Sequence, residues 1–162
     1  LGKIAKKYGT TIELIKRRND LESDVIRVGQ NLSIWTEVFI LEVSKAGNSL
    51  KIKLKDRELK FYPISTGKAE TSTPAGQYEI ITRLIEPTWF HEGEVVPYGV
   101  PENPLGTRWL GFDESGYGIH GTNKPDEIGR PVSHGCIRMY NEDVEELFSL
   151  VPLGTKLVIK EE

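Results

Sequence analysis

The chain has 162 residues and a formal net charge of −3, with 38% hydrophobic residues, 28% charged residues, 16 glycines and 9 prolines. This length can bury one ordinary core with a small appendage, and the composition is that of a turn-rich globular protein, not of a disordered chain. The charge provides no basic surface for a phosphate backbone, so we expect no nucleic-acid partner. No apolar run approaches the roughly 18 residues that span a bilayer, and Leu1 is followed by no signal-peptide pattern, so we expect neither a membrane span nor a signal peptide in this sequence.

The first residues predict two short helices. Apolar residues recur on one helical face at Leu1, Ile4, Ala5 and Tyr8. Gly9 follows them, as a glycine often follows a helix that ends in a left-handed turn. Thr10 and Glu13 stand three residues apart, the spacing of a capping box, so we expect a second helix that begins here and ends near Asn19.

Residues 1–35 resemble a LysM module, the small unit that binds peptidoglycan and chitin. The resemblance is carried by the helix IAKKYGT and by GQNLSI, which predicts a closing strand over 32–35. It implies a partner made of glycan strands. The family's opening strand and its Gly-Asp-Thr helix start are absent from this sequence, and a plain helical hairpin packed on the next domain is the alternative.

A period of two begins at Val38 and predicts a meander of strands. Leu50, Ile52 and Leu54 alternate with lysines, which is the pattern of a strand with one buried face and one solvated face. Turn residues separate the segments. We expect strands over residues 38–43, 49–55, 58–64 and 77–82.

Residues 84–108 show little periodicity and contain four prolines, so they predict a long loop. Long loops in compact domains often act as lids or as walls of a binding site. The aromatic and imidazole side chains of this loop either line a groove or fill the core beneath it: Trp89, Phe90, His91 and Tyr98.

The last third of the chain returns to short strands, expected over 109–112, 117–119 and 156–160. A helix is expected to start at Asn141 as its cap, with one buried apolar stripe. The fold class is therefore mainly β, with one helix after the cysteine.

Cys136 is the only cysteine, so within this chain it is an inert buried residue, a metal ligand or a nucleophile. A nucleophilic thiolate needs a positive neighbour or peptide dipoles and a base. His120 can supply the base and Arg138 the charge or a fork for a substrate carboxylate. Gly135 permits close approach of a substrate, and the amides around it can face an oxyanion.

Each of these residues also has an ordinary structural interpretation, as a core histidine, a surface ion-pair partner or a turn glycine. A zinc site is a further alternative, although its spacing is unusual for zinc. It would use His91, His120, His134 and Cys136.

The segments SHGCIRM (133–139) and YGIHGTN (117–123) resemble the signature of the L,D-transpeptidases of the YkuD type. TPAGQY (73–78) resembles a further segment of that family. The match covers about residues 37 to 160. It implies a sandwich- or barrel-like β domain over 37–162, preceded by a small α+β, LysM-like peptidoglycan-binding segment over 1–36.

The resemblance implies Cys136 as nucleophile, His120 as general base and acid, and the Gly121 carbonyl as the third member of the triad. It places the oxyanion and substrate contacts around Cys136, at Ser133, His134, Gly135 and Arg138. Arg138 stands where some members have asparagine.

The implied activity is transfer between peptidoglycan stem tetrapeptides through a thioester, which forms 3→3 cross-links. There are three alternatives. The protein could be an L,D-carboxypeptidase, which hydrolyses the same thioester, a non-catalytic LysM-type wall-binding protein, or a cysteine protease of broad specificity. The resemblance implies no cofactor and no metal, carbapenems as covalent inhibitors, and a location in the bacterial cell wall outside the cytoplasm, with vegetative and spore walls both open.

Overall fold

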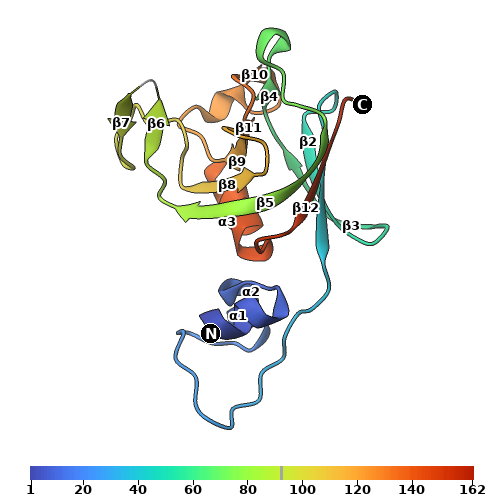
Figure 1. Ribbon diagram of the computed structural model, residues 1–162, viewed down its shortest axis with the longest axis vertical. Helices are drawn as coiled ribbons and strands as arrows, with labels where there is room; N and C mark the ends of the chain where they lie inside the picture. The colour runs from blue at the N-terminus through green and yellow to red at the C-terminus, as the bar shows by residue number, and fades with distance from the viewer. Residues whose placement is uncertain (92) are drawn as a thin grey trace.

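An eight-stranded, curled sheet forms the body of the computed structural model, which describes residues 1–91 and 93–162 (Figure 1). Its strands lie in the order β11-β9-β8-β5-β12-β1-β2-β3. They are β1 (Phe39–Ser44), β2 (Ser49–Leu54), β3 (Arg57–Pro63), β5 (Gly76–Ile85), β8 (Arg108–Phe112), β9 (Gly118–His120), β11 (Ile137–Arg138) and β12 (Lys156–Lys160). Two separate pairs complete the β structure: β4 (Thr66–Gly67) with β10 (Pro131–Ser133), and β6 (Trp89–His91) with β7 (Glu94–Val96).

The meander β1-β2-β3 forms where the alternating pattern predicts it. Leu41, Leu50 and Ile52 are completely buried on the inner face. The lysines between them lie on the other face, where Lys51 pairs with Glu58 at 2.8 Å. Alternation therefore predicts both faces, because successive side chains of a strand point to opposite sides.

Helix α3 (Asn141–Leu150) packs its apolar stripe against the sheet (Figure 1). Val144 and Leu147 are fully buried in the main hydrophobic core. The expected cap is wrong, because the N-cap residue is Tyr140 and Asn141 is the first helical residue. The Asn141 side chain bonds to Thr122 instead.

The expected long loop over 84–108 is partly wrong. Strand β5 continues to Ile85, and β6 and β7 pair as a hairpin that projects from the sheet (Figure 1). Cross-strand apolar pairs such as Trp89 with Val96 support the pairing. Phe90 is 72% exposed, so it does not fill the core, whereas Tyr98 lines a surface pocket near Thr122.

Two helices, α1 (Gly2–Tyr8) and α2 (Ile12–Arg18), form the N-terminal segment. Gly9 ends α1 in the left-handed conformation, at φ 60°, as predicted. The predicted capping box is wrong, because Thr11 caps α2 by accepting a hydrogen bond from the Leu14 amide at 3.0 Å. The Thr11 hydroxyl also donates to the Ser149 carbonyl, which joins α2 to the end of α3.

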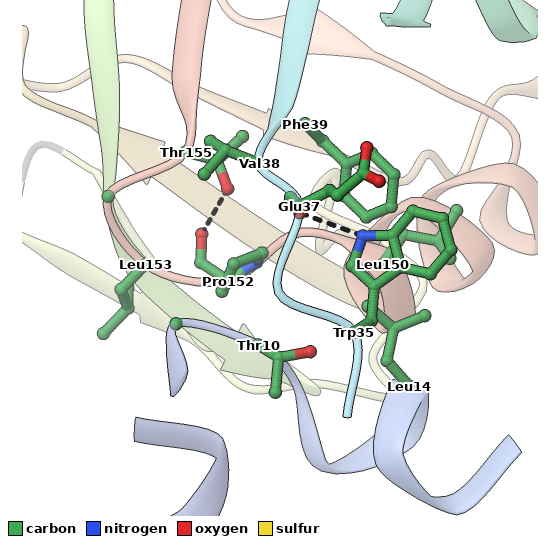
Figure 2. Close-up of a pocket in the computed structure, with 12 residues that line it drawn as sticks. Thr10, Leu14, Trp35, Glu37, Val38, Phe39, Leu150, Pro152, Leu153 and Thr155 are labelled. Atoms are coloured by element: carbon green, nitrogen blue, oxygen red, sulfur yellow. Dashed lines mark hydrogen bonds between the residues drawn. The ribbon is translucent and has the colours of Figure 1, made fainter. Parts of the chain in front are cut away.

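The expected strand over 32–35 is wrong, and the described N-terminal segment contains helices but no strand. A strand needs a partner backbone, and here the Asn19 side chain takes that place. It accepts from the Ser33 amide at 2.7 Å and donates to the Ser33 carbonyl at 2.8 Å. Trp35 then stacks on Phe39 at 5.6 Å, beside a pocket between the helices and the sheet domain (Figure 2). Among the described residues, no helix is long and apolar enough to cross a membrane.

Candidate active site

Parallel pairing of β9 with β11 brings the histidine and the cysteine of the signature together. His120 lies opposite Arg138 in the register, and Ile119 lies opposite Ile137. Cys136 precedes β11, so it lies beside Gly118, two residues before His120 on the neighbouring strand. The segment between the two residues folds back, because the parallel register requires it.

The His120 ring is buried at 3% exposure, and its Nδ1 lies 2.7 Å from the Gly121 carbonyl oxygen. A carbonyl only accepts, so in this contact Nδ1 carries the proton and Nε2 keeps its lone pair. Burial is the main cause that lowers the pKa of His120 to about 4, and the Arg138 charge acts in the same direction, whereas the backbones of Gly121 and Leu105 oppose it. At neutral pH the ring is therefore neutral and able to accept a proton.

Trp109 on β8 covers the histidine. It is the register partner of His120, and the two rings stack at 5.7 Å with 19° between their planes. A Cβ on Gly118 would lie 2.5 Å from the Trp109 ring, so the glycine of the signature makes room for this indole. The sequence pattern predicts only a strand at Trp109, and no local pattern indicates this contact.

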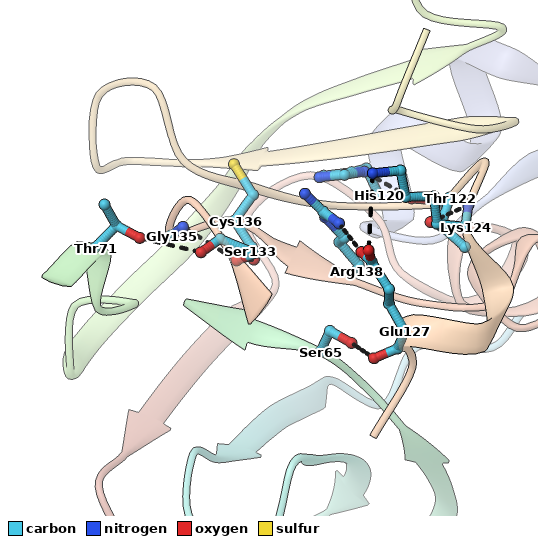
Figure 3. A network of polar contacts seen from close by, with 11 residues as sticks. Ser65, Thr71, His120, Thr122, Lys124, Glu127, Ser133, Gly135, Cys136 and Arg138 are labelled. Atoms are coloured by element: carbon cyan, nitrogen blue, oxygen red, sulfur yellow. Dashed lines mark hydrogen bonds and ion pairs between the residues drawn. The ribbon is translucent and has the colours of Figure 1, made fainter. Parts of the chain in front are cut away.

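The loop that carries Cys136 is held by side-chain hydrogen bonds. The Ser133 hydroxyl donates to the Cys136 carbonyl and accepts from the Gly135 amide at 3.1 Å (Figure 3). The Thr73 hydroxyl donates to the Gly135 carbonyl and accepts from the Gly67 amide, both at 2.8 Å. Ser133 and Thr73 are buried, so both serve to shape this loop.

Gly135 is required at its position for two reasons. Its φ of +118° is one that side chains rarely adopt, and a Cβ there would lie 2.7 Å from the Tyr117 ring. Its amide is already bonded to Ser133, so the next amide, that of Cys136, is the candidate donor to an oxyanion.

The Cys136 thiol is half-buried, and its Sγ donates to the Gly116 carbonyl at 3.6 Å, not to His120. Burial raises the pKa of Cys136, whereas the Gly118 backbone and the Arg138 charge lower it more weakly. The Arg138 charge therefore favours the thiolate, as a positive neighbour should, but in the free site desolvation of the sulfur outweighs the charge.

Arg138 is held by an acidic residue that the sequence analysis did not single out. Its Nη1 lies 2.7 Å from Glu127 Oε2, and Glu127 also lies near Lys124 at 3.7 Å (Figure 3). The Ser65 hydroxyl donates to the Glu127 carbonyl at 2.7 Å, which fixes this turn. A substrate carboxylate would have to share the guanidinium of Arg138 with Glu127.

The remaining predicted contact, His134, lies exposed next to Gly135. Among the residues that the structure describes, no three His, Cys, Asp or Glu side chains gather closely enough to hold a metal ion. The zinc alternative therefore has no support in the described part of the chain.

Comparison with known proteins gives the same fold and assigns both parts of the chain to known families. The model of the L,D-transpeptidase catalytic domain, YkuD, matches residues 39–159, and that of the LysM domain matches residues 1–35. A protein of Bacillus licheniformis named L,D-transpeptidase YkuD is 38% identical over 98% of this chain and 92% of its own length.

Two solved structures share the fold. L,D-transpeptidase 3 from Mycobacterium tuberculosis, in complex with a faropenem-derived adduct, matches with a TM-score of 0.65 and 19% identity over 77% of this chain. The L,D-transpeptidase LdtMt1, in complex with imipenem, matches with a TM-score of 0.63 and 17% identity over 76% of this chain. The matches cover 61% and 59% of those two chains. The chain described here belongs to the L,D-transpeptidase family, with a YkuD catalytic domain that follows a LysM domain.

Proposed function

We propose that the protein is a cysteine-dependent L,D-transpeptidase that acts on peptidoglycan stem tetrapeptides and forms 3→3 cross-links through a thioester. The observation that supports this proposal best is the pairing of β9 with β11. His120, a buried imidazole oriented by the Gly121 carbonyl, lies on β9, and the only thiol of the chain directly precedes β11.

In the first half-reaction, His120 Nε2 takes the Cys136 proton as the sulfur attacks the carbonyl carbon of the third stem residue. A half-buried thiol with a raised pKa supports proton transfer during attack and not before it. The oxyanion of the tetrahedral intermediate would accept from the Cys136 amide. When the intermediate collapses, the C–N bond to the terminal D-Ala breaks and its amine takes the proton from His120, which leaves the thioester.

In the second half-reaction, the side-chain amine of a third residue in a neighbouring stem attacks the thioester. His120 accepts a proton from this amine and returns it to the departing sulfur. The products are the cross-link and the free thiol. Water in place of the amine would give a tripeptide by hydrolysis.

We assign residues 37–162 to this catalysis and residues 1–36 to attachment on glycan strands, in the bacterial cell wall outside the cytoplasm. Helix α2 packs against the end of α3 and α1 packs on α2, so the proposed anchor is held against the catalytic domain. By similarity to the imipenem complex of LdtMt1, we also propose that carbapenems acylate Cys136.

The test is mass spectrometry of the protein with a purified disaccharide-tetrapeptide, beside the Cys136→Ala variant. We expect a cross-linked dimer and a transient acyl-enzyme with the natural chain only. Tripeptide alone, carrying oxygen from labelled water, would assign the site to hydrolysis. Untouched substrate that still binds the protein would contradict the proposal in favour of a non-catalytic wall-binding protein.

A further inference from the structure

The Asn141 side chain makes a two-point contact with the backbone next to the histidine. Its Oδ1 accepts from the Thr122 amide at 3.0 Å, and its Nδ2 donates to the Thr122 carbonyl at 3.0 Å. Thr122 is 3% exposed, so water does not readily replace these bonds. Asn141 therefore holds Thr122 as a neighbouring strand would.

The contact reaches His120 through one rigid peptide unit. The Gly121 carbonyl and the Thr122 N–H belong to the same planar peptide. The carbonyl faces His120 Nδ1, while the N–H faces Asn141 Oδ1. Rotation of this peptide would break both bonds at once, so the asparagine fixes the direction of the carbonyl that orients the imidazole.

The surrounding packing is adapted to this amide. A Cβ on Gly106 would lie 2.2 Å from Asn141 Oδ1, and a Cβ on Gly121 would lie 2.1 Å from it. The two glycines therefore leave the space that the Asn141 amide fills. Asn141 is not the cap of α3, so its side chain has no competing task at the helix start.

We propose that Asn141 is a positioning residue for the general base, acting through the Gly121–Thr122 peptide to keep His120 in the Nδ1–H tautomer. The assignment of His120 as base rests on the proposed function, whereas the effect on the tautomer does not. Without the clamp the peptide can rotate, Nδ1 loses its acceptor, and part of the population carries its proton on Nε2, where it cannot accept the thiol proton.

The test compares four variants of the full chain. Asn141→Ala removes both bonds, and Asn141→Asp keeps the acceptor for the Thr122 amide. Val144→Ala is the matched control for stability, because Val144 is fully buried in the same helix and its apolar side chain makes no hydrogen bond to Thr122. Asn123→Ala removes an exposed amide that bonds only to Pro101.

Two quantities are measured: the tautomer of His120 by nitrogen NMR of labelled imidazoles, assigned with His120→Gln, and the rate of acyl-enzyme formation with imipenem by mass spectrometry. We expect Asn141→Ala to gain the Nε2–H tautomer and to lose about 100-fold in rate, the size expected for a misplaced catalytic group. Asn141→Asp should give an intermediate tautomer ratio and rate, because it keeps the bond to the Thr122 amide but cannot donate to the Thr122 carbonyl. Val144→Ala and Asn123→Ala should keep the natural tautomer and rate.

An unchanged tautomer in Asn141→Ala would overturn the proposal, as would an equal loss of rate in Val144→Ala at equal stability. If Asn141→Ala does not fold, Asn141→Ser replaces it, because the serine hydroxyl is too short to reach both Thr122 groups. The same outcomes in Asn141→Ser then support or overturn the proposal. If the natural chain forms no acyl-enzyme while the tautomer still depends on Asn141, the proposed function fails and the positioning role stands.

Discussion

The two sides of the site are held by different means. His120 lies in the sheet between β8 and β11, under Trp109, and is almost completely buried. Cys136 lies just outside the two-residue strand β11, in a loop tied by the hydroxyls of Ser133 and Thr73. Backbone ladders in a packed sheet open less readily than loops held by single side chains. We therefore infer that the proposed base is the more firmly held partner, and we expect the proposed nucleophile to be the side that adjusts to substrate.

The largest effect is expected from removal of the base. His120→Gln should slow acyl-enzyme formation by about 10² to 10⁴, because a half-buried thiol of raised pKa loses its proton less readily without an acceptor. Rapid-mixing mass spectrometry with imipenem measures the rate, and His134→Gln, which changes an exposed histidine, is the control. If His134→Gln is acylated slowly while His120→Gln is acylated at the natural rate, the base is His134 and not His120.

The burial of His120 also predicts a pH dependence of stability. The unfolded chain takes up a proton at this residue near pH 6.5, whereas the folded chain does so only near pH 4. The stabilisation is therefore complete above pH 6.5 and is lost as the pH falls toward 4, by on the order of 3 kcal/mol. Urea unfolding of the natural chain and of His120→Gln gives the unfolding free energy of each at several pH values, and the pH dependence of their difference is the contribution of His120. Parallel curves of unfolding free energy against pH would contradict the prediction.

Thr73→Val should destabilise the loop that carries Cys136 and leave the contacts of His120 unchanged. The change keeps the shape of the side chain but removes the bonds to Gly67 and Gly135, at a cost of about 1–3 kcal/mol in unfolding free energy. We expect acylation to slow by about tenfold, as the loop loses its position. Thr155→Val, a buried threonine bonded to Pro152, is the control that should lose stability but not rate.

The smallest effect concerns the free thiol. Because burial raises the pKa of Cys136, its alkylation by iodoacetamide near neutral pH should be slower than that of a model thiol by a few-fold. Arg138→Met should slow it further, since the positive charge lowers this pKa. Lys124→Met is the control, an exposed charge beside Glu127. Alkylation faster than the model thiol would indicate a thiolate already formed.

Much of the fold could be predicted from local patterns. The alternation around Leu50 and Ile52 predicts the meander, and Gly9 predicts the end of α1, because these features depend on neighbours in sequence. The strand over 32–35 could not be assessed locally, since a strand exists only with a partner, and Asn19 takes that place. The β6-β7 hairpin was missed for the same reason, because its support comes from cross-strand pairs.

The sequence by itself determined the chemical groups: one thiol, a histidine 16 residues before it, and the glycines around both. Only the tertiary structure decided their state. The parallel register pairs the strand of His120 with the strand that Cys136 directly precedes, and burial favours the neutral form of both side chains. Asn141 had the sequence pattern of a helix cap, yet the fold brings it to Thr122 across 19 positions. Protonation and orientation depend on which atoms exclude water and which donors face which acceptors, and both depend on contacts between residues far apart in the chain.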